Sequence, residues 1–165
     1  MITLKKILCP VDHSECSYLA LKYAISLALK DEAQLYLMHV IDTRLYDTEI
    51  YKFSSYKPNE IDISKIREDL LKSLPEGTTD VLKVETIVVK GIPFNEIINA
   101  ASEIGADIIV IGTHGRTGLS HIMMGSVAEK IVRLAACPVL TIKPDEFREL
   151  VNLTEEDVAN GLHLP

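Results

Sequence analysis

The feature of this sequence that most constrains its fold is an alternation of short apolar runs with apolar stripes at helical spacing. Five runs have the length of a β-strand, and they cover residues 7–11, 34–41, 84–89, 106–112 and 138–142. Between them, apolar residues recur every three or four positions, which is the period of a helix with one buried face. This order predicts an α/β fold: a three-layer sandwich around a five-stranded, mainly parallel sheet.

Capping and breaking residues mark where several of the helices begin and end. Ser14 is suited to cap a helix after the first strand, and Pro93 is suited to the first turn of a later one. Gly105 is expected to end that later helix, and Pro75 with Gly77 to close a helical stripe over residues 63–74. A last helix is expected to start at Ser126.

Composition excludes several classes of protein. A chain of 165 residues with a net charge of -7 suits one domain and lacks the basic character of a nucleic-acid binder. Its apolar runs are too short to span a membrane, and its first residues turn polar too soon for a signal peptide, so we expect a soluble, cytoplasmic protein. The three cysteines form no CxxC pair and the histidines form no HxxxH or HExxH motif, so no protein-bound metal site is expected.

The most informative segment is a glycine-bearing loop between the fourth strand and the last helix. It contains Gly112, Gly115 and Gly125, and Ser126 follows directly. Glycines permit positive φ and let backbone N–H groups approach an anion, and the first N–H groups of a helix attract negative charge. The Ser126 hydroxyl is able to cap the helix or to bond a phosphate, and Arg116 offers a charge-assisted contact. The segment is neither a Walker loop nor a GxGxxG turn. On glycine spacing alone, the alternative interpretation is a long turn with three structural glycines.

A second half-site is predicted at the carboxyl end of the first strand. Ligands of open parallel sheets bind beyond the carboxyl ends of the strands, where the strand order reverses. If strands one and four are neighbours, Asp12 faces the glycine loop and is placed to bond ribose hydroxyls or a base amine. Its alternative role is an acidic cap beside a helix start. Val40, near the end of the second strand, is either an apolar wall for a flat base or part of the core.

These residues resemble a known family. Lys6-Ile7-Leu8-Cys9-Pro10-Val11-Asp12, the Gly112-x2-Gly115-x9-Gly125-Ser126 pattern and Cys137-Pro138-Val139-Leu140 are similar to motifs of the ATP-binding branch of the universal stress proteins. The resemblance covers approximately residues 3–143. It implies a Rossmann-like sheet of order 3-2-1-4-5 and a homodimer formed through the last strand, in the region of residues 139–142.

The resemblance also implies which residues hold the nucleotide. Adenine and ribose would lie against the ends of the first two strands, the ribose and phosphates against the glycine loop, and a Mg²⁺ or Mn²⁺ ion on the phosphates. The residues carried over are Pro10, Val11, Asp12, Val40, Ile111, Gly112, His114, Gly115, Arg116, Gly125, Ser126 and Val127. One departure is His13, which stands where many members have glycine; its side chain either narrows the ribose pocket or points outward.

Two segments lie outside this pattern. Residues 145–165 form a tail in which Thr154 and the acidic residues after it resemble a helix start, leaving residues 1–144 as the nucleotide-binding domain. Residues 42–60 have no clear period and carry Tyr46, Tyr51, Phe53 and Tyr56. These aromatic residues either anchor a protein partner or pack the segment onto the sheet.

The function expected from these features is that of an ATP-binding regulatory or stress-response protein, with AMP or ADP as other possible ligands. Two other classes stay open. Asp12, His114 and Ser126 are predicted near the phosphates, which allows slow ATP hydrolysis or self-phosphorylation, although the serine is better explained by holding phosphate than by attacking it. The third class is an interaction module that works without nucleotide. No catalytic residue is assigned.

Overall fold

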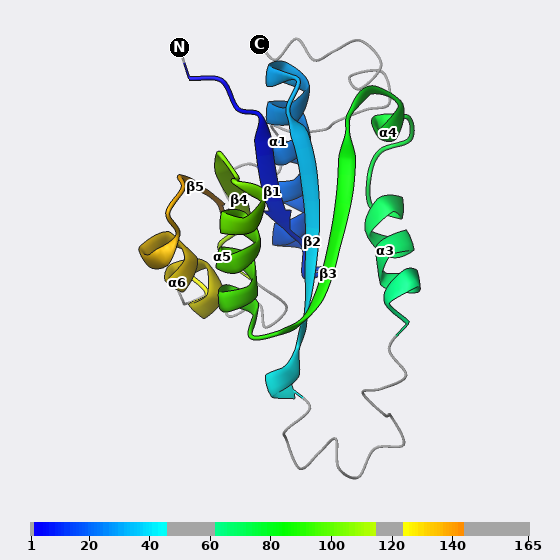
Figure 1. Cartoon of the computed structure of the whole chain (residues 1–165). Helices are drawn as coiled ribbons and strands as arrows, with labels where there is room; N and C mark the ends of the chain where they lie inside the picture. Colours follow the sequence, from blue (N-terminus) through cyan, green and yellow to red (C-terminus); the bar gives the residue numbers. More distant parts are fainter. Residues whose placement is uncertain (1, 46–61, 115–123, 144–165) are drawn as a thin grey trace.

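The structure is a computed structural model that describes residues 2–45, 62–114 and 124–143 (Figure 1). Strands and helices alternate along the chain, as the apolar pattern predicts. The elements are β1 (Lys6–Pro10), α1 (Glu15–Asp31), β2 (Gln34–Asp42), the short 3-10 helix η1 (Thr43–Leu45), α3 (Ile63–Lys72), α4 (Thr78–Val81), β3 (Val84–Gly91), α5 (Pro93–Ile104), β4 (Ile108–Gly112), α6 (Ser126–Leu134) and β5 (Val139–Ile142).

The strands form one five-stranded sheet of order β3-β2-β1-β4-β5. Every neighbouring pair in it is parallel, and the predicted fold class and strand order are confirmed. The first strand is central: Ile7 pairs with Leu35 of β2 on one side and with Ile108 of β4 on the other. The strand order therefore reverses between β1 and β4, where the crevice for a ligand is expected.

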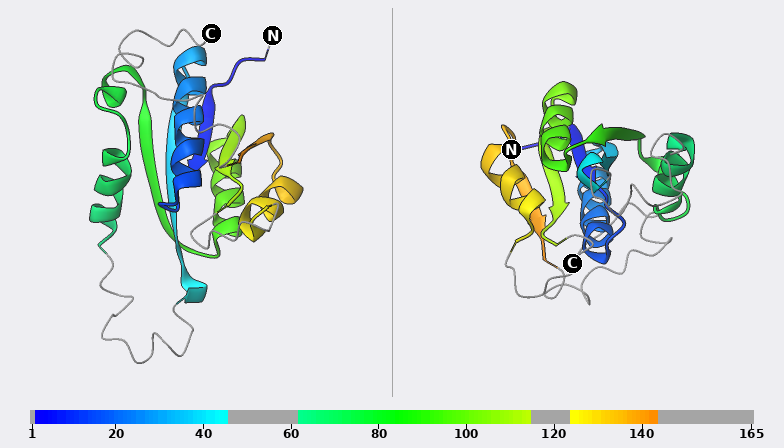
Figure 2. Two further views of the ribbon diagram at one scale, coloured as in Figure 1. Left: turned by 180° about the vertical axis from the view of Figure 1, so that it is seen from behind. Right: turned by 90° about the horizontal axis from the view of Figure 1, so that it is seen from below.

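Successive residues of each strand belong to opposite faces of the sheet, because side chains alternate along a strand. On one face, Ile7 and Cys9 of β1 pack in a core with α1 and with Leu70 of α3. On the other face, Leu8 packs with α5 and α6. Figure 2 shows α5 and α1 on opposite faces of the sheet. Cys9 is fully buried, and this burial raises the pKa of its thiol to about 12.

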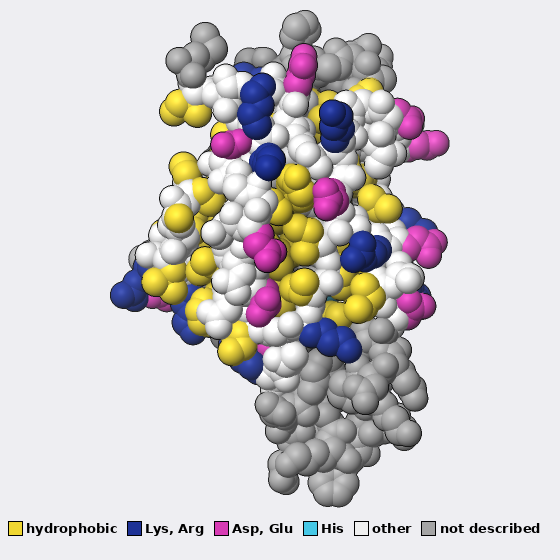
Figure 3. All heavy atoms as spheres, in the orientation of Figure 1, with side chains coloured by type: hydrophobic (Ala, Val, Ile, Leu, Met, Phe, Trp, Pro, Cys, Tyr) yellow, Lys and Arg dark blue, Asp and Glu magenta, His cyan; other side chains and the backbone are white. Residues whose placement is uncertain are grey.

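The face that carries α5 and α6 is covered unevenly. Ile87 and Val89 of β3 are only partly buried there. Figure 3 shows hydrophobic side chains gathered over β2, between α5 and β3. The sheet is thus packed against helices on both faces, but less completely toward its β3 edge.

Most helix boundaries follow the predicted signals. Ser14 is the N-cap of α1 and accepts a hydrogen bond from the Ser17 N–H, and Gly105 ends α5 with φ 63°. The stripe over residues 63–74 is shorter than expected, because α3 ends at Lys72. The sequence interpretation also missed α4. Gly77, with φ 79°, precedes its first residue, Thr78, which is fully buried.

Two sequence-based hypotheses concern residues that the structure does not describe. The aromatic anchors of residues 42–60 belong to the undescribed range 46–61, and the tail falls within 144–165. Among the described helices, none has the length and apolar character needed to cross a bilayer.

Candidate functional site

A cavity of about 350 Å³ lies at the carboxyl ends of β1, β2 and β4, beside the first turns of α5 and α6. It is at the reversal of strand order, where the sequence places the ligand. Its described lining residues are Pro10, Val11, Asp12, Ser17, Met38, His39, Val40, Asp42, Arg44, Pro93, Ile97, Ile111, Gly112, Thr113, His114, Gly125, Ser126, Val127 and Ala128.

The structure brings the predicted site residues together. Every one of them that the structure describes lines this cavity: Pro10, Val11, Asp12, Val40, Ile111, Gly112, His114, Gly125, Ser126 and Val127. The remaining two, Gly115 and Arg116, lie outside the described residues.

On the β1 side, the Asp12 carboxylate is held by the start of α1. Its Oδ1 accepts hydrogen bonds from the Ser14 N–H at 3.0 Å and from the Ser14 hydroxyl at 2.5 Å. The Ser14 hydroxyl also lies 3.5 Å from the carbonyl oxygen of His114, on the opposite wall. Asp12 thus supports the cap of α1 through one oxygen and still faces the cavity, so the two roles expected for it are compatible.

The next wall is formed by the end of β2. His39 Nδ1 lies 2.8 Å from the carbonyl oxygen of Val11. A carbonyl oxygen only accepts, so Nδ1 carries the proton and donates it. Val40 is partly buried, packs against the core beneath α5 and also lines the cavity. An apolar surface for a flat ring is therefore available at this end.

His13 lies beside the cavity without being part of its described lining. It has φ 66°, a left-handed conformation that explains why glycine is favoured here. Its ring is exposed, with Nδ1 2.9 Å from the Tyr18 hydroxyl and its centroid 4.9 Å from that of His39. His13 is absent from the described cavity lining, which favours the outward of the two orientations expected for its side chain.

On the β4 side, two glycines are required by crowding. A Cβ on Gly112 would lie 2.7 Å from Cys16 Sγ and 2.9 Å from the Cys16 carbonyl oxygen, and one on Gly125 would lie 2.9 Å from the Thr113 carbonyl oxygen. Neither is among the glycines with positive φ, and Gly125 has φ -68°. Positive φ, which glycine permits, is therefore not what either position uses. Their role is to let α1 and the loop approach the end of β4.

The end of β4 is tied to the end of β5 through Thr113. The buried Thr113 hydroxyl donates to the Ile142 carbonyl oxygen at 3.2 Å, and the Thr113 N–H donates to the same oxygen at 2.9 Å. Thr113 Oγ1 also lies 2.9 Å from His114 Nδ1, within hydrogen-bond distance. His114 is thereby fixed by Thr113 at the rim of the cavity.

The start of α6 completes this wall. Gly125 is the N-cap, no side chain caps the helix, and Ser126 is its first residue. Of the two roles expected for the Ser126 hydroxyl, helix capping is therefore wrong. The N–H groups of Ser126 and Val127 belong to the first turn, where no intrahelical acceptor exists and the helix dipole favours an anion.

Several lining residues were not predicted: Ser17, Met38, His39, Asp42, Arg44, Pro93, Ile97, Thr113 and Ala128. Helical or strand periodicity assigns Met38, Ile97 and Ala128 to the core, and their second role depends on where the cavity opens. Thr113 directly follows the predicted Gly112, which is a signal that would have found it.

For metals, the described residues contain no group of three or more His, Cys, Asp or Glu side chains able to hold an ion.

Comparison with known proteins shows close relatives. The sequence profile of the universal stress protein family matches residues 3–143. The universal stress protein MJ0531 of Methanocaldococcus jannaschii is 37% identical over 139 residues, covering 84% of this chain and 82% of the relative.

Solved structures share the fold. That of hypothetical protein MJ0577 superposes with a TM-score of 0.73 at 34% identity, covering 87% of this chain and 98% of that one. A universal stress protein in complex with cAMP has a TM-score of 0.62 at 20% identity, covering 86% and 98%.

Proposed function

The chain belongs to the universal stress protein family, and from this premise we propose that it is a regulatory or stress-response protein that binds ATP in the cavity between β1, β4 and α6. The observation that carries the proposal is the meeting of two unlike walls. A carboxylate, Asp12, faces a helix start at Ser126 across one cavity. The volume of about 350 Å³ is within the range of small-molecule sites.

Each wall suits a different part of a nucleotide. Val40, with Pro10 and Val11 beside it, offers the apolar surface for adenine. Asp12 is placed for the ribose hydroxyls, which donate to a carboxylate, and it would repel phosphate. Ile111, Gly112 and His114 border the ribose and phosphates.

The phosphates belong at the start of α6 in this proposal. Backbone N–H groups of Ser126 and Val127, with the Ser126 hydroxyl, are donors suited to phosphate oxygens. Gly125 supports them by allowing the helix start to approach Thr113, and Gly115 and Arg116 are proposed as further contacts. A Mg²⁺ or Mn²⁺ ion is proposed to be bound mainly by the phosphates, since Mg²⁺ commonly binds through substrate phosphates.

Calorimetry on protein stripped of nucleotide tests this function. We expect ATP to bind in the micromolar to millimolar range, with ADP and AMP weaker as phosphates are removed. Denaturing release followed by mass spectrometry identifies any nucleotide that is purified with the protein. Because a structural neighbour is in complex with cAMP, AMP and cAMP are included as comparison ligands. Absence of ATP binding up to several millimolar would contradict the proposal.

A binding role is favoured over catalysis by the surroundings of His114. Its Nδ1 contacts the Thr113 hydroxyl. In a Ser-His-Asp triad, that nitrogen would instead donate to the carboxylate that orients the base. We expect ATP turnover at the buffer background in protein shown to bind ATP, and phosphate release above background would favour the enzyme alternative.

A homodimer through β5 is proposed as the assembly. β5 is an edge strand, and Val139, Leu140 and Thr141 in it are only partly buried. An apolar edge strand requires cover against uncontrolled pairing, and a second copy supplies it. Sedimentation over a range of concentrations tests this, and a monomer at all concentrations would contradict it.

Residues 42–60 are proposed as a partner surface, tested by comparing pull-downs with and without this segment.

A further inference from the structure

The cavity has a charged wall that the proposed nucleotide contacts do not use. It consists of Asp42, the last residue of β2, and Arg44 in η1. Arg44 Nε donates to Asp42 Oδ1 at 2.9 Å and Nη2 donates to Oδ2 at 2.6 Å, so the guanidinium is clamped by two parallel hydrogen bonds. The Arg44 N–H also donates to Oδ1, at 3.0 Å, which fixes the turn itself.

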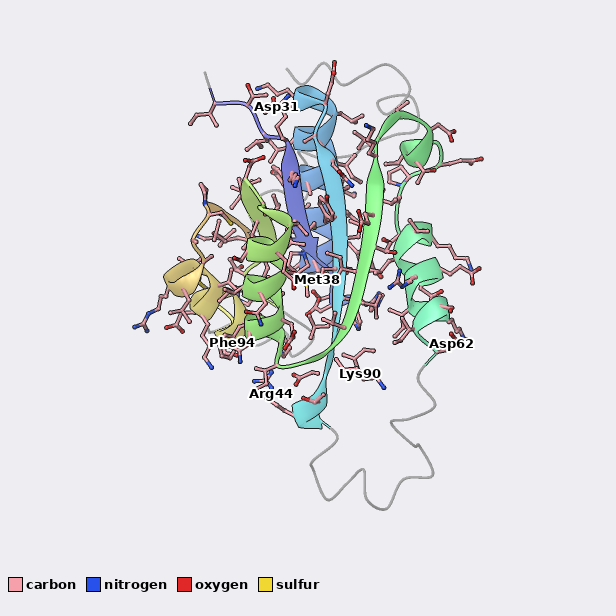
Figure 4. All side chains as sticks on the ribbon, viewed as in Figure 1. Asp31, Met38, Arg44, Asp62, Lys90 and Phe94 are labelled. Atoms are coloured by element: carbon pink, nitrogen blue, oxygen red, sulfur yellow. The ribbon has the colours of Figure 1, made fainter. Side chains whose placement is uncertain are left out.

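This clamp lies at the base end of the cavity. Asp42 and Arg44 line the same cavity as Val40 and as Pro93, the first residue of α5. Figure 4 shows Arg44 at the end of β2, at the same end of the molecule as Phe94 in the first turn of α5. Two strand spacings, about 10 Å, separate β2 from β4 in the sheet, so this wall extends from the strand on the far side of β1 from the one that leads to the phosphate loop.

The hydrogen bonds determine which part of Arg44 is left for a ligand. The edge of the guanidinium formed by Nε and Nη2 is directed at Asp42. A guanidinium is planar and carries five N–H groups, so with two of them engaged it keeps its flat faces and its outer edge for a ligand. Such a face stacks on aromatic rings, whereas a phosphate is bound through the edge.

Asp42 holds this geometry more firmly than an exposed pair would. Its side chain is 11% exposed, against 48% for Arg44, so the carboxylate is largely sheltered and the guanidinium reaches toward solvent. Hydrogen bonding to Asp42 raises the pKa of Arg44, and the side chain is charged under all ordinary conditions. The pair therefore presents a pre-positioned, flat cation.

From this geometry we propose that Arg44, positioned by Asp42, stacks on the purine ring of the bound nucleotide and closes the base end of the cavity. This inference rests on the proposed nucleotide-binding function and adds a base-contacting residue to it. Stacking uses the ring face rather than the pattern of edge donors and acceptors. Arg44 therefore strengthens the binding of purines in general, and selection of adenine over guanine falls to other groups.

The test compares ligands with and without a base. Calorimetry is performed on Arg44→Ala and Arg44→Lys with ATP, GTP and tripolyphosphate as separate probes. We expect both variants to bind ATP and GTP about tenfold more weakly. Removing a side chain that stacks on a base typically lowers the affinity by that factor or more. Tripolyphosphate affinity is expected to stay unchanged. Arg67→Ala, on an exposed arginine of α3, is the matched control.

A positioning role for Asp42 is tested in the same way. Asp42→Asn replaces the carboxylate that accepts both Arg44 hydrogen bonds by a neutral amide of similar shape. We expect a loss of ATP affinity smaller than that of Arg44→Ala, and no loss of tripolyphosphate affinity. Thermal unfolding of each variant shows whether the fold is kept.

Three results would overturn the inference: an unchanged ATP affinity in Arg44→Ala, full retention in Arg44→Lys, or an equal loss for tripolyphosphate. The last two would assign Arg44 to charge rather than stacking. Failure of the unmodified protein to bind ATP would instead refute the proposed function itself.

Discussion

The two walls of the cavity are built in opposite ways. The β1 wall is held by side chains: Asp12 and Ser14 bond each other, and His39 bonds the Val11 carbonyl oxygen. The β4 wall depends on the lack of side chains, since Gly112 and Gly125 touch backbone atoms that a Cβ would displace. One wall can thus be weakened by removing atoms, and the other by adding them.

This difference matches the ligand chemistry proposed for each wall. Ribose hydroxyls need an oriented acceptor, which a carboxylate fixed by a helix cap supplies. Phosphates need several backbone N–H groups at close range, which glycines make accessible. The two helix starts show the same contrast, because α1 is capped by Ser14 whereas α6 has no side-chain cap.

The largest effect is expected from Gly112→Ala. The added methyl meets both the Sγ and the backbone of Cys16, so we expect a loss of about 2–3 kcal/mol in the free energy of unfolding, measured with urea. Gly105→Ala is the matched control: with φ 63° and open space around it, it suffers only backbone strain of about 1 kcal/mol. Equal losses in the free energy of unfolding of the two variants would show that crowding at Gly112 has no effect of its own.

The next effect tests the β1 wall. Asp12→Asn keeps the shape of the side chain but removes its charge, and we expect ATP affinity to fall about tenfold or more. With 2′,3′-dideoxy-ATP, which lacks the hydroxyls, the variant and the original protein should bind equally in calorimetry. A loss that persists with the dideoxy nucleotide would assign Asp12 to the base amine.

A smaller effect separates the two serines at the helix starts. Ser14→Ala removes the cap of α1 and should lower the free energy of unfolding by about 1 kcal/mol. Ser126→Ala, on an exposed residue that caps nothing, should change it by less than about 0.5 kcal/mol, yet weaken ATP binding about threefold to tenfold. A larger loss of stability for Ser126→Ala than for Ser14→Ala in urea denaturation would contradict this difference between the two helix starts.

The smallest effect is expected from His13→Gly. Relief of the left-handed conformation offsets the lost bond to Tyr18, so stability should change by less than about 1 kcal/mol. Because the His13 ring is absent from the described cavity lining, ATP affinity should stay the same. A change of more than threefold in the Kd would show that the ring contributes to the site after all.

Sequence reasoning predicted the parts of this molecule that depend on local pattern. The strand order required the family resemblance in addition to the five apolar runs. Ser14, Pro93 and Gly105 marked helix ends because their backbone chemistry acts within a few residues. By contrast, α4 and η1 span four and three residues, which is too short for a period to be visible.

The site was predictable in position but not in its physical causes. Gly112 is recognisable as part of a motif, yet only the folded chain shows that Cys16 excludes a side chain there. Asp42 and Arg44 fit no spacing rule, since their pairing depends on the turn after β2 and their place on the cavity wall depends on α5. Contacts between distant segments carry this information, and local sequence patterns do not.

An amide chemical-shift titration with ATP shows whether one nucleotide contacts both walls, because it reports on both at once. We expect the amides of Ser126 and Val127 and those of Asp12 and Val40 to shift together along one saturating curve, while the amides of α3 stay unchanged. Shifts confined to one wall, or centred away from this cavity, would contradict a nucleotide held between the two.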